Sequence, residues 1–325
     1  MKPSESFFSE SISDDHYNCS VCPRNCNTDR NSFISGYCNT STDFEIASIC
    51  IHKGEEPAIS GDIGICNVFF NSCNLQCIFC QNKQISSNSL NNIKSYSTLN
   101  DIVEKICSCL DQGCHAVGFV SPSHMIPQML RIINALHKIG RKPVIVYNTN
   151  AYDKVEVLKQ LEGLIDVYLP DLKYSQAKLA AEFSDSSDYV DVANLAVREM
   201  FRQKGTPLHL DEFGRAVSGL IIRHLVLPGY SENSKGVLRN IAENLSPRVH
   251  ISLMSQYYPM DSVISHVNLN RFLRADEYNE IIHEMENLGM ENGWVQELES
   301  SRLYLPDFRL NQPFKEELNP KPETA

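Results

Sequence analysis

Several features that mark other protein classes are missing from this chain of 325 residues. Residues 1–15 contain neither a basic cluster nor an apolar stretch, so they do not resemble a secretory signal. No run of about 18 apolar residues, the length that crosses a bilayer, occurs anywhere. Lysine and arginine number 29 against 40 acidic residues, so neither nucleic acid nor an anionic membrane is expected as a partner. These absences predict a cytoplasmic protein.

Cysteine, in contrast, is abundant, with 12 residues, and a reducing cytosol favours metal ligation over disulfides. Cys73, Cys77 and Cys80 form a C-x3-C-x2-C triplet directly after an apolar run that predicts a strand. Thiolates bind soft metals and iron–sulfur clusters, and three of them leave one position of a four-ligand centre open. The alternatives are a structural zinc site completed by a distant ligand and three unrelated buried cysteines.

The triplet, with Phe79 directly before its last cysteine, resembles the signature of the radical S-adenosylmethionine enzymes. In that family three cysteines hold three irons of a [4Fe-4S] cluster, and S-adenosylmethionine chelates the fourth iron. Reductive cleavage of the cofactor gives a 5′-deoxyadenosyl radical that abstracts a hydrogen atom from the substrate. The resemblance implies that Cys73, Cys77 and Cys80 bind the cluster and that Phe79 lies beside the adenine.

The longer stretch GEEPAISGDIG, followed by FFNSCNLQCIFCQN, resembles the uncharacterised branch related to pyruvate formate-lyase activating enzyme. This resemblance implies a glycyl-radical activase, with a glycyl-radical protein as substrate and a flavodoxin- or ferredoxin-type electron donor. A second interpretation keeps the cofactor but makes the substrate a small molecule or a peptide. A third is a non-enzymatic iron–sulfur or zinc scaffold that binds metal without using the cofactor.

The first sixty residues form a cysteine-rich segment with little hydrophobic periodicity. Four of its cysteines follow the spacing C-x2-C-x3-C-x11-C, namely Cys19, Cys22, Cys26 and Cys38. Four thiols can complete a tetrahedral or a cubane site, so we expect a second metal site holding zinc or a second iron–sulfur cluster. The alternative is that these cysteines pack as small hydrophobic residues or have a redox role. Cys50 and Cys66 flank expected strands and are assigned to the core.

After the triplet, apolar strands alternate with amphipathic helices, which predicts a parallel sheet covered by helices. The expected strands lie within 65–70, 115–122, 143–150, 165–174, 219–229 and 249–259. Six β/α units are too few for the closed eight-stranded barrel but fit the partial (β/α)6 barrel of the radical S-adenosylmethionine fold. We therefore divide the chain into a cysteine-rich N-terminal segment (1–60), the barrel core (61–265) and a C-terminal helix/strand extension with a tail (266–325), disordered from about Glu316.

Polar residues follow several of the expected strands at their carboxyl ends, where active sites of such folds lie. We expect Ser121, Asn150, Asp171 and Lys173 to orient the cofactor or the substrate. For Asp171 and Lys173, an ion pair without a binding role is an equal alternative. Activating enzymes carry a Gly-Gly-Glu element after the second strand that binds the amino group of the cofactor. Here the corresponding stretch, GFVSPSH, has no acidic residue, so that ligand must come from elsewhere.

Overall fold

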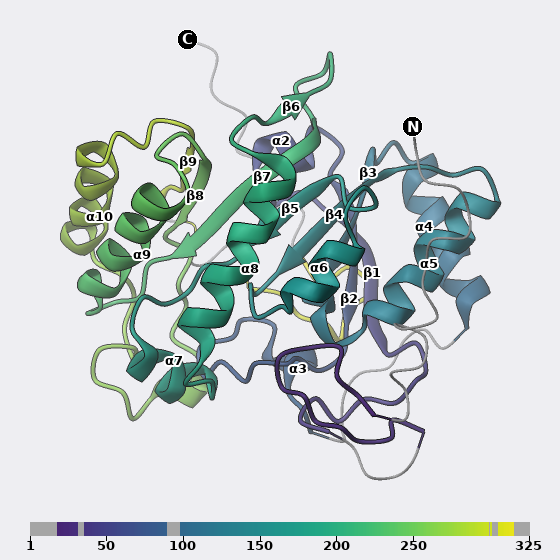
Figure 1. Ribbon diagram of the computed structural model, residues 1–325, viewed down its shortest axis with the longest axis horizontal. Coiled ribbons are helices and arrows are strands. Elements are labelled where there is room, and N and C mark those ends of the chain that lie inside the picture. Colours follow the sequence, from purple (N-terminus) through teal and green to yellow (C-terminus); the bar gives the residue numbers. More distant parts are fainter. Residues whose placement is uncertain (1–17, 32–35, 90–97, 299, 301–304, 315–325) are drawn as a thin grey trace.

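The computed structural model of this chain describes residues 18–31, 36–89, 98–298, 300 and 305–314 (Figure 1). Its strands are β1 Ile46–His52, β2 Ile65–Phe70, β3 Ala116–Val120, β4 Val144–Thr149, β5 Val167–Pro170, β6 His209–Leu210, β7 Ala216–Leu225, β8 His250–Met254 and β9 Gly293–Val295. Its helices are α2 Pro57–Ser60, α3 Lys83–Ser86, α4 Leu99–Asp111, α5 Ile126–Lys138, α6 Val155–Gln160, α7 Ala177–Ser184, α8 Tyr189–Lys204, α9 Ser231–Asn244 and α10 Ala275–Asn287, with short 3-10 turns at Pro122–His124 and Asp261–Val263. The tail beyond 314, expected to be disordered, lies outside the described residues.

One sheet runs through the molecule in the order β1-β2-β3-β4-β5-β7-β8-β9. The pairs from β2 to β9 along this path are parallel. Helices lie between successive strands and cover the outer face of the sheet (Figure 1). The six strands expected from the sequence are β2, β3, β4, β5, β7 and β8, so the partial (β/α)6 barrel is confirmed.

The sequence did not predict two features at the edges of the sheet. β1 lies inside the cysteine-rich segment, whose sequence shows little periodicity, and its antiparallel pairing with β2 runs from Ile46 opposite Phe70 to His52 opposite Ile65. β9 is the strand with Trp294 that the sequence predicts for the C-terminal extension, but its parallel pairing with β8 was not predicted. Both the N-terminal and the C-terminal segments of the expected division therefore contribute a strand to the barrel sheet.

Residues of each strand alternate between an outer and an inner face. On the outer face, Val68 of β2 joins the large hydrophobic core that includes the helices. On the inner face, Ile65 packs in a smaller apolar cluster with Val146 and Val167. Above that cluster the inner positions become polar, with Asn67, Asn148, Asp171, Arg223 and Ser252. The barrel interior therefore has a closed apolar floor and a polar upper layer.

The hydrophobic core on the outer face explains why the helices form where the periodicity predicts them. Ile102, Ile106 and Cys109 form the buried stripe of α4, and Thr98 caps its first turn by accepting a hydrogen bond from the backbone N–H of Asp101. Within the described residues, no helix is both long and apolar enough to cross a membrane.

Candidate active site

The cysteine triplet lies in the loop that follows β2, the first parallel strand. The chain leaves the strand through Ser72, whose φ of 65° is left-handed, and the backbone N–H of Cys73 donates to Asn88 Oδ1 at 3.0 Å. Cys73 is buried, while Cys77 and Cys80 are partly exposed. The loop therefore places three thiols at the carboxyl ends of the strands, as the sequence predicted.

Each of the three sulfurs accepts a hydrogen bond from another part of the chain. Asn150 Nδ2 donates to Cys73 Sγ at 3.3 Å. Ser184 Oγ donates to Cys77 Sγ at 2.9 Å, and Ser86 Oγ donates to Cys80 Sγ at 3.2 Å. These hydrogen bonds fix the side chains and stabilise negative charge on sulfur. Asn150, which was expected to orient the cofactor or the substrate, contacts the sulfur of Cys73 instead of lining the adjacent cavity.

Two thiols of the triplet have a pKa above the ordinary value. Burial, together with the neighbouring Cys77 and Cys80, raises the pKa of Cys73 to about 12. Burial likewise raises the pKa of Cys77 to about 11, although the nearby Lys173 ammonium opposes the rise. A metal ligand must be deprotonated, so a positive centre between these sulfurs is what would convert them to thiolates near neutral pH.

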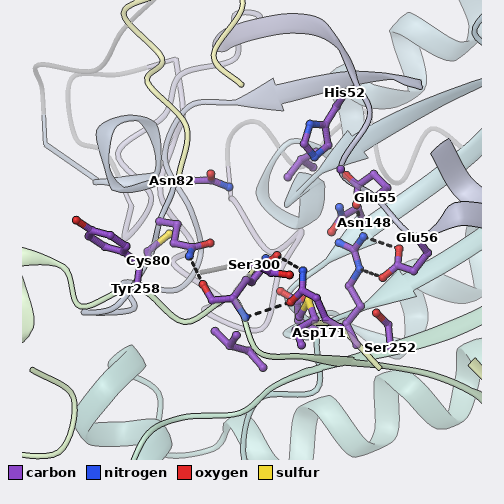
Figure 2. Close-up of a pocket in the computed structure, with 18 of the residues that line it drawn as sticks. His52, Glu55, Glu56, Cys80, Asn82, Asn148, Asp171, Ser252, Tyr258 and Ser300 are labelled. Carbon is purple, nitrogen blue, oxygen red and sulfur yellow. Dashed lines mark hydrogen bonds and ion pairs between the residues drawn. The ribbon is translucent and has the colours of Figure 1, made fainter. Parts of the chain in front are cut away.

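A cavity of about 420 Å³ opens beside the triplet, within the range of sites that hold cofactors. Figure 2 shows Cys80 and Tyr258 on one side of it and His52, Glu55 and Glu56 on the other. Besides Cys77 and Cys80, four of the five residues expected to contact the cofactor or substrate line it: Phe79, Ser121, Asp171 and Lys173. The cavity is therefore lined both by thiols of the triplet and by most of the strand-end residues that we expected at the site.

Asp171 and Lys173 form an ion pair in this wall, with Lys173 Nζ 2.7 Å from Asp171 Oδ2. Burial alone would lower the pKa of Lys173, but Asp171 and the thiol of Cys77 outweigh it, so the pKa lies above its ordinary value. Lys173 stays charged beside the sulfur of Cys77. The structure shows the ion pair and its place in the cavity wall, and a role in binding stays a prediction.

The structure adds two glutamates to the site and pairs them with Arg223, a polar residue of an expected strand. Arg223 of β7 donates to Glu56 through Nε at 2.8 Å and through an Nη atom at 2.7 Å, and it also pairs with Glu55. Asn67 donates to the second oxygen of Glu55 at 2.7 Å. All three charged side chains line the cavity. The signal in the sequence was an arginine inside an apolar strand, together with two adjacent glutamates.

The turn after β3 lacks an acid in space as well as in sequence. Ser121 adopts a left-handed φ of 49° and its N–H donates to Asn148 O at 2.7 Å. Ser123 and His124 are buried, and His124 Nε2 hydrogen-bonds the backbone oxygen of Asn71 at 2.8 Å. Acidic side chains reach the cavity from other elements instead: Glu55, Glu56, Asp171 and Glu297.

The N-terminal cysteines form a separate group beside the triplet loop. All four line one small cavity, and burial, together with the neighbouring Cys38, Cys19 and Cys26, raises the pKa of Cys22 to about 12. Cys50 and Cys66 are buried in the core, as expected. Within the described residues, no three cysteine, histidine or acidic side chains are arranged to hold a metal ion as they stand.

The donor chemistry of the triplet nevertheless fits the iron–sulfur cluster implied by the resemblance. Cys73, Cys77 and Cys80 are free of disulfides, and thiolates are the usual ligands of such clusters. The neighbouring 420 Å³ cavity provides the space beside them.

Comparison with known proteins gives matches in sequence and in structure. No family model matches the chain. It is 26% identical over 280 residues to the uncharacterised protein MJ0674 of Methanocaldococcus jannaschii, which covers 84% of this chain and 76% of that protein.

The similar solved structures include SuiB of Streptococcus suis bound to its precursor peptide SuiA, with a TM-score of 0.46 and 14% identity over 74% of this chain. The match covers 51% of SuiB, so the chain spans about half the length of that protein. HydG, a maturase of the [FeFe]-hydrogenase, has a TM-score of 0.48 and 12% identity over 70% of this chain and 50% of HydG. A domain of pyruvate-formate lyase-activating enzyme from Bacteroides vulgatus has a TM-score of 0.38 and 14% identity over 53% of this chain and 92% of that domain.

Proposed function

We propose that this chain is a radical S-adenosylmethionine enzyme that abstracts a hydrogen atom from its substrate. The observation that carries the proposal is the triplet loop itself: three hydrogen-bonded thiols at the carboxyl end of the first parallel strand, next to a cavity of about 420 Å³. Three thiols leave one cluster position for a cofactor. The bound cluster and cofactor would supply the one-electron chemistry.

The chain's own residues would bind, orient and shield the reacting groups. Cys73, Cys77 and Cys80 would ligate a [4Fe-4S] cluster, and Phe79, which lies in the cavity wall, would contact the adenine of S-adenosylmethionine. The charged Lys173 suits the carboxylate of the cofactor, and Asp171 its amino group. Asn150 would act through the sulfur of Cys73. Ser121 would form part of the cavity wall around the bound cofactor.

We further propose a glycyl-radical protein as substrate, with electrons delivered by a flavodoxin- or ferredoxin-type donor. The support is the resemblance of the triplet loop and of the GEEP stretch to the branch related to pyruvate formate-lyase activating enzyme. A backbone glycine presents little volume, which suits a cavity that must also hold the cofactor.

A small molecule is the second candidate substrate, and one observation favours it. Ser300 and Phe314, from the C-terminal part of the chain, line the cavity together with the barrel residues. Phe314 packs on His52 with their ring centroids 3.9 Å apart. This wall narrows the access that a folded protein would need.

The test is production of 5′-deoxyadenosine by protein reconstituted anaerobically with iron and sulfide and then reduced. The parent and a Cys107→Ala control, which removes a half-buried cysteine outside both groups, should form it from S-adenosylmethionine. A Cys73→Ala, Cys77→Ala, Cys80→Ala variant should lose more of that rate than the roughly 10–100-fold that removal of a metal ligand's supporting partners costs, because the ligands themselves are removed. Bound iron in the parent without any product would contradict the proposal and leave a metal scaffold. A glycyl-radical signal in an added glycyl-radical enzyme would separate the two substrate candidates.

A further inference from the structure

The cavity between the N-terminal segment and the triplet loop has the size of a single water molecule. It measures about 10 Å³, which is the least volume that holds one water, and far less than the cavity beside the triplet. Ten of its lining residues carry thiol, hydroxyl, imidazole or guanidinium groups: Cys19, Cys22, Arg24, Cys26, Thr28, Arg30, Tyr37, Cys38, Thr40 and His124. Its lining is therefore rich in groups that bind ions, and its volume limits the occupant to one atom or a small molecule.

Three buried polar atoms around this cavity have no hydrogen-bond partner within the described residues. They are Thr28 Oγ1, Arg30 Nε and His124 Nδ1. His124 is 1% exposed and Arg30 is 4% exposed, so bulk water does not satisfy them. Buried polar groups in folded proteins are satisfied in the great majority of cases. Their clustering at one cavity is what a ligand binding there would explain.

Charge adds to this indication. The hydrogen bonds of Arg30 go to neutral acceptors: the backbone oxygens of His124 and Ser41, the hydroxyl of Thr40 and the sulfur of Met125. A buried guanidinium is costly unless negative charge lies near it. Four cysteines around one cation carry a net negative charge as thiolates, which Arg30 would balance.

We propose that Cys19, Cys22, Cys26 and Cys38 bind one Zn²⁺ ion at this cavity. Four thiolates complete the tetrahedral coordination that structural zinc adopts, and the cavity has room for one ion but not for an iron–sulfur cubane. The thiols are not arranged around one point as they stand, so binding turns their side chains inward and releases their protons. Arg30 Nε then donates to a thiolate.

This zinc site would stabilise the position of the loop that carries Cys73, Cys77 and Cys80. Arg24, two residues after Cys22, donates through Nε to the backbone oxygen of Asn74 at 2.9 Å. Tyr37, next to Cys38, accepts at its backbone oxygen from Asn88 Nδ2 at 2.7 Å, and Asn88 in turn accepts the N–H of Cys73. A bound ion would therefore fix the N-terminal segment, which is hydrogen-bonded to Asn74 and Asn88 on either side of Cys73.

The test is the zinc content of the full chain, expressed with zinc present and measured by mass spectrometry. The parent and the Cys73→Ala, Cys77→Ala, Cys80→Ala variant should each hold about one zinc per chain. A Cys22→Ser, Cys26→Ser variant should hold less than about a tenth of that, while the Cys107→Ser control keeps it. Because the triplet variant is included, zinc binding is measured independently of any radical chemistry.

Zinc retained by the Cys22→Ser, Cys26→Ser variant would overturn the proposal, as would its absence from the parent. If the Cys22→Ser, Cys26→Ser variant loses bound iron that the triplet variant keeps, the zinc proposal is wrong and the four cysteines bind a second iron–sulfur cluster. If the double variant does not fold, the parent is tested with Co²⁺ in place of zinc. Thiolate-to-cobalt absorption that added Zn²⁺ abolishes supports a tetrathiolate site, and its absence in the triplet variant overturns the assignment.

Discussion

Hydrogen bonds to sulfur are the residue-scale feature that ties the triplet to the rest of the barrel. Asn150 follows β4, Ser184 ends α7 and Ser86 ends α3, yet each donates to a different cysteine. The cysteines could be selected from their spacing alone. The two serines could not, because nothing in a helix-forming sequence tells which serine will face a sulfur; only the packing of the elements decides it.

The buried ion group of Arg223, Glu55 and Glu56 makes the stability of the folded protein depend on pH. Burial alone would raise the pKa of Glu55, but the adjacent Arg223 outweighs it and lowers the pKa to about 2. A lowered carboxyl pKa stabilises the folded state above the unfolded value of about 4.3, and this stabilisation is lost as the pH falls toward 2.

Replacement of Arg223 should reverse the pH dependence of this contribution to stability. In Arg223→Met, Glu55 and Glu56 are buried together without a cation, so we expect a loss of about 3–5 kcal/mol in the free energy of unfolding at pH 7. Their pKa values then rise above the unfolded value, so the loss should shrink as the pH falls from 7 to 5. Urea unfolding across this pH range measures it.

Arg239→Met is the matched control, because Arg239 forms an exposed pair with Glu284 at 2.7 Å. Its loss should stay below about 1 kcal/mol and should not change between pH 5 and pH 7. An equal loss for Arg223→Met at every pH would show that the buried charges do not cause its instability.

At the scale of elements, the pairing of β9 with β8 depends on one glycine. Gly293 has a φ of 121°, and a Cβ built there would lie 1.9 Å from the backbone oxygen of Ile251. Only glycine permits this approach between the strands. Trp294, which lines the cavity, is carried by the same short strand.

Gly293→Ala should therefore lower the free energy of unfolding by about 3 kcal/mol, since the new methyl group must push the strands apart. Gly289→Ala is the control: Gly289 also has a positive φ, of 68°, but no atom lies within 4 Å of its Cβ position. It should cost only the backbone strain of about 1–2 kcal/mol. Chemical denaturation of both variants gives the comparison, and equal losses would show that strain rather than the clash is responsible.

The strands and helices of the barrel were predictable because their periodicity is strong and their apolar faces pack on one core. The antiparallel pairing of β1 with β2 was not predicted, because a strand's partner is known only once the chain folds back. The cavity wall was predictable in part: Asp171 and Lys173 end a strand, whereas Glu55 reaches the site only because β1 lies beside β2. Pairings distant in sequence leave no local pattern.

At the scale of the whole molecule, the two outermost segments of the described chain meet at the β1 edge of the sheet. Gln312 Nε2 donates to the backbone oxygen of Ile51 at 2.7 Å. Phe308 and Phe314 pack on Phe69 of β2, with ring centroids 5.2 and 5.7 Å away. Of the two, only Phe314 lines the cavity beside the triplet.

Removal of each ring should separate packing from ligand binding. Phe314→Ala should weaken S-adenosylmethionine binding about tenfold, or about 1.4 kcal/mol, because water enters the cavity. Phe308→Ala, which removes a ring that is 3% exposed, should lower stability by about 3–5 kcal/mol but leave the affinity of the folded protein unchanged. Trp294 is the single tryptophan and lines the cavity, so its fluorescence reports the binding. Unchanged affinity in Phe314→Ala would show that the C-terminal wall does not shield the cofactor.

The meeting of these segments also sets an order of assembly during synthesis. β1 and β2 leave the ribosome early, yet the rings that cover Phe69 belong to residues 308 and 314. Until then the nascent chain exposes an aromatic surface next to the unpaired edge of β1, which is a site for aggregation. Chains interrupted before residue 308 should therefore depend on chaperones more than completed ones.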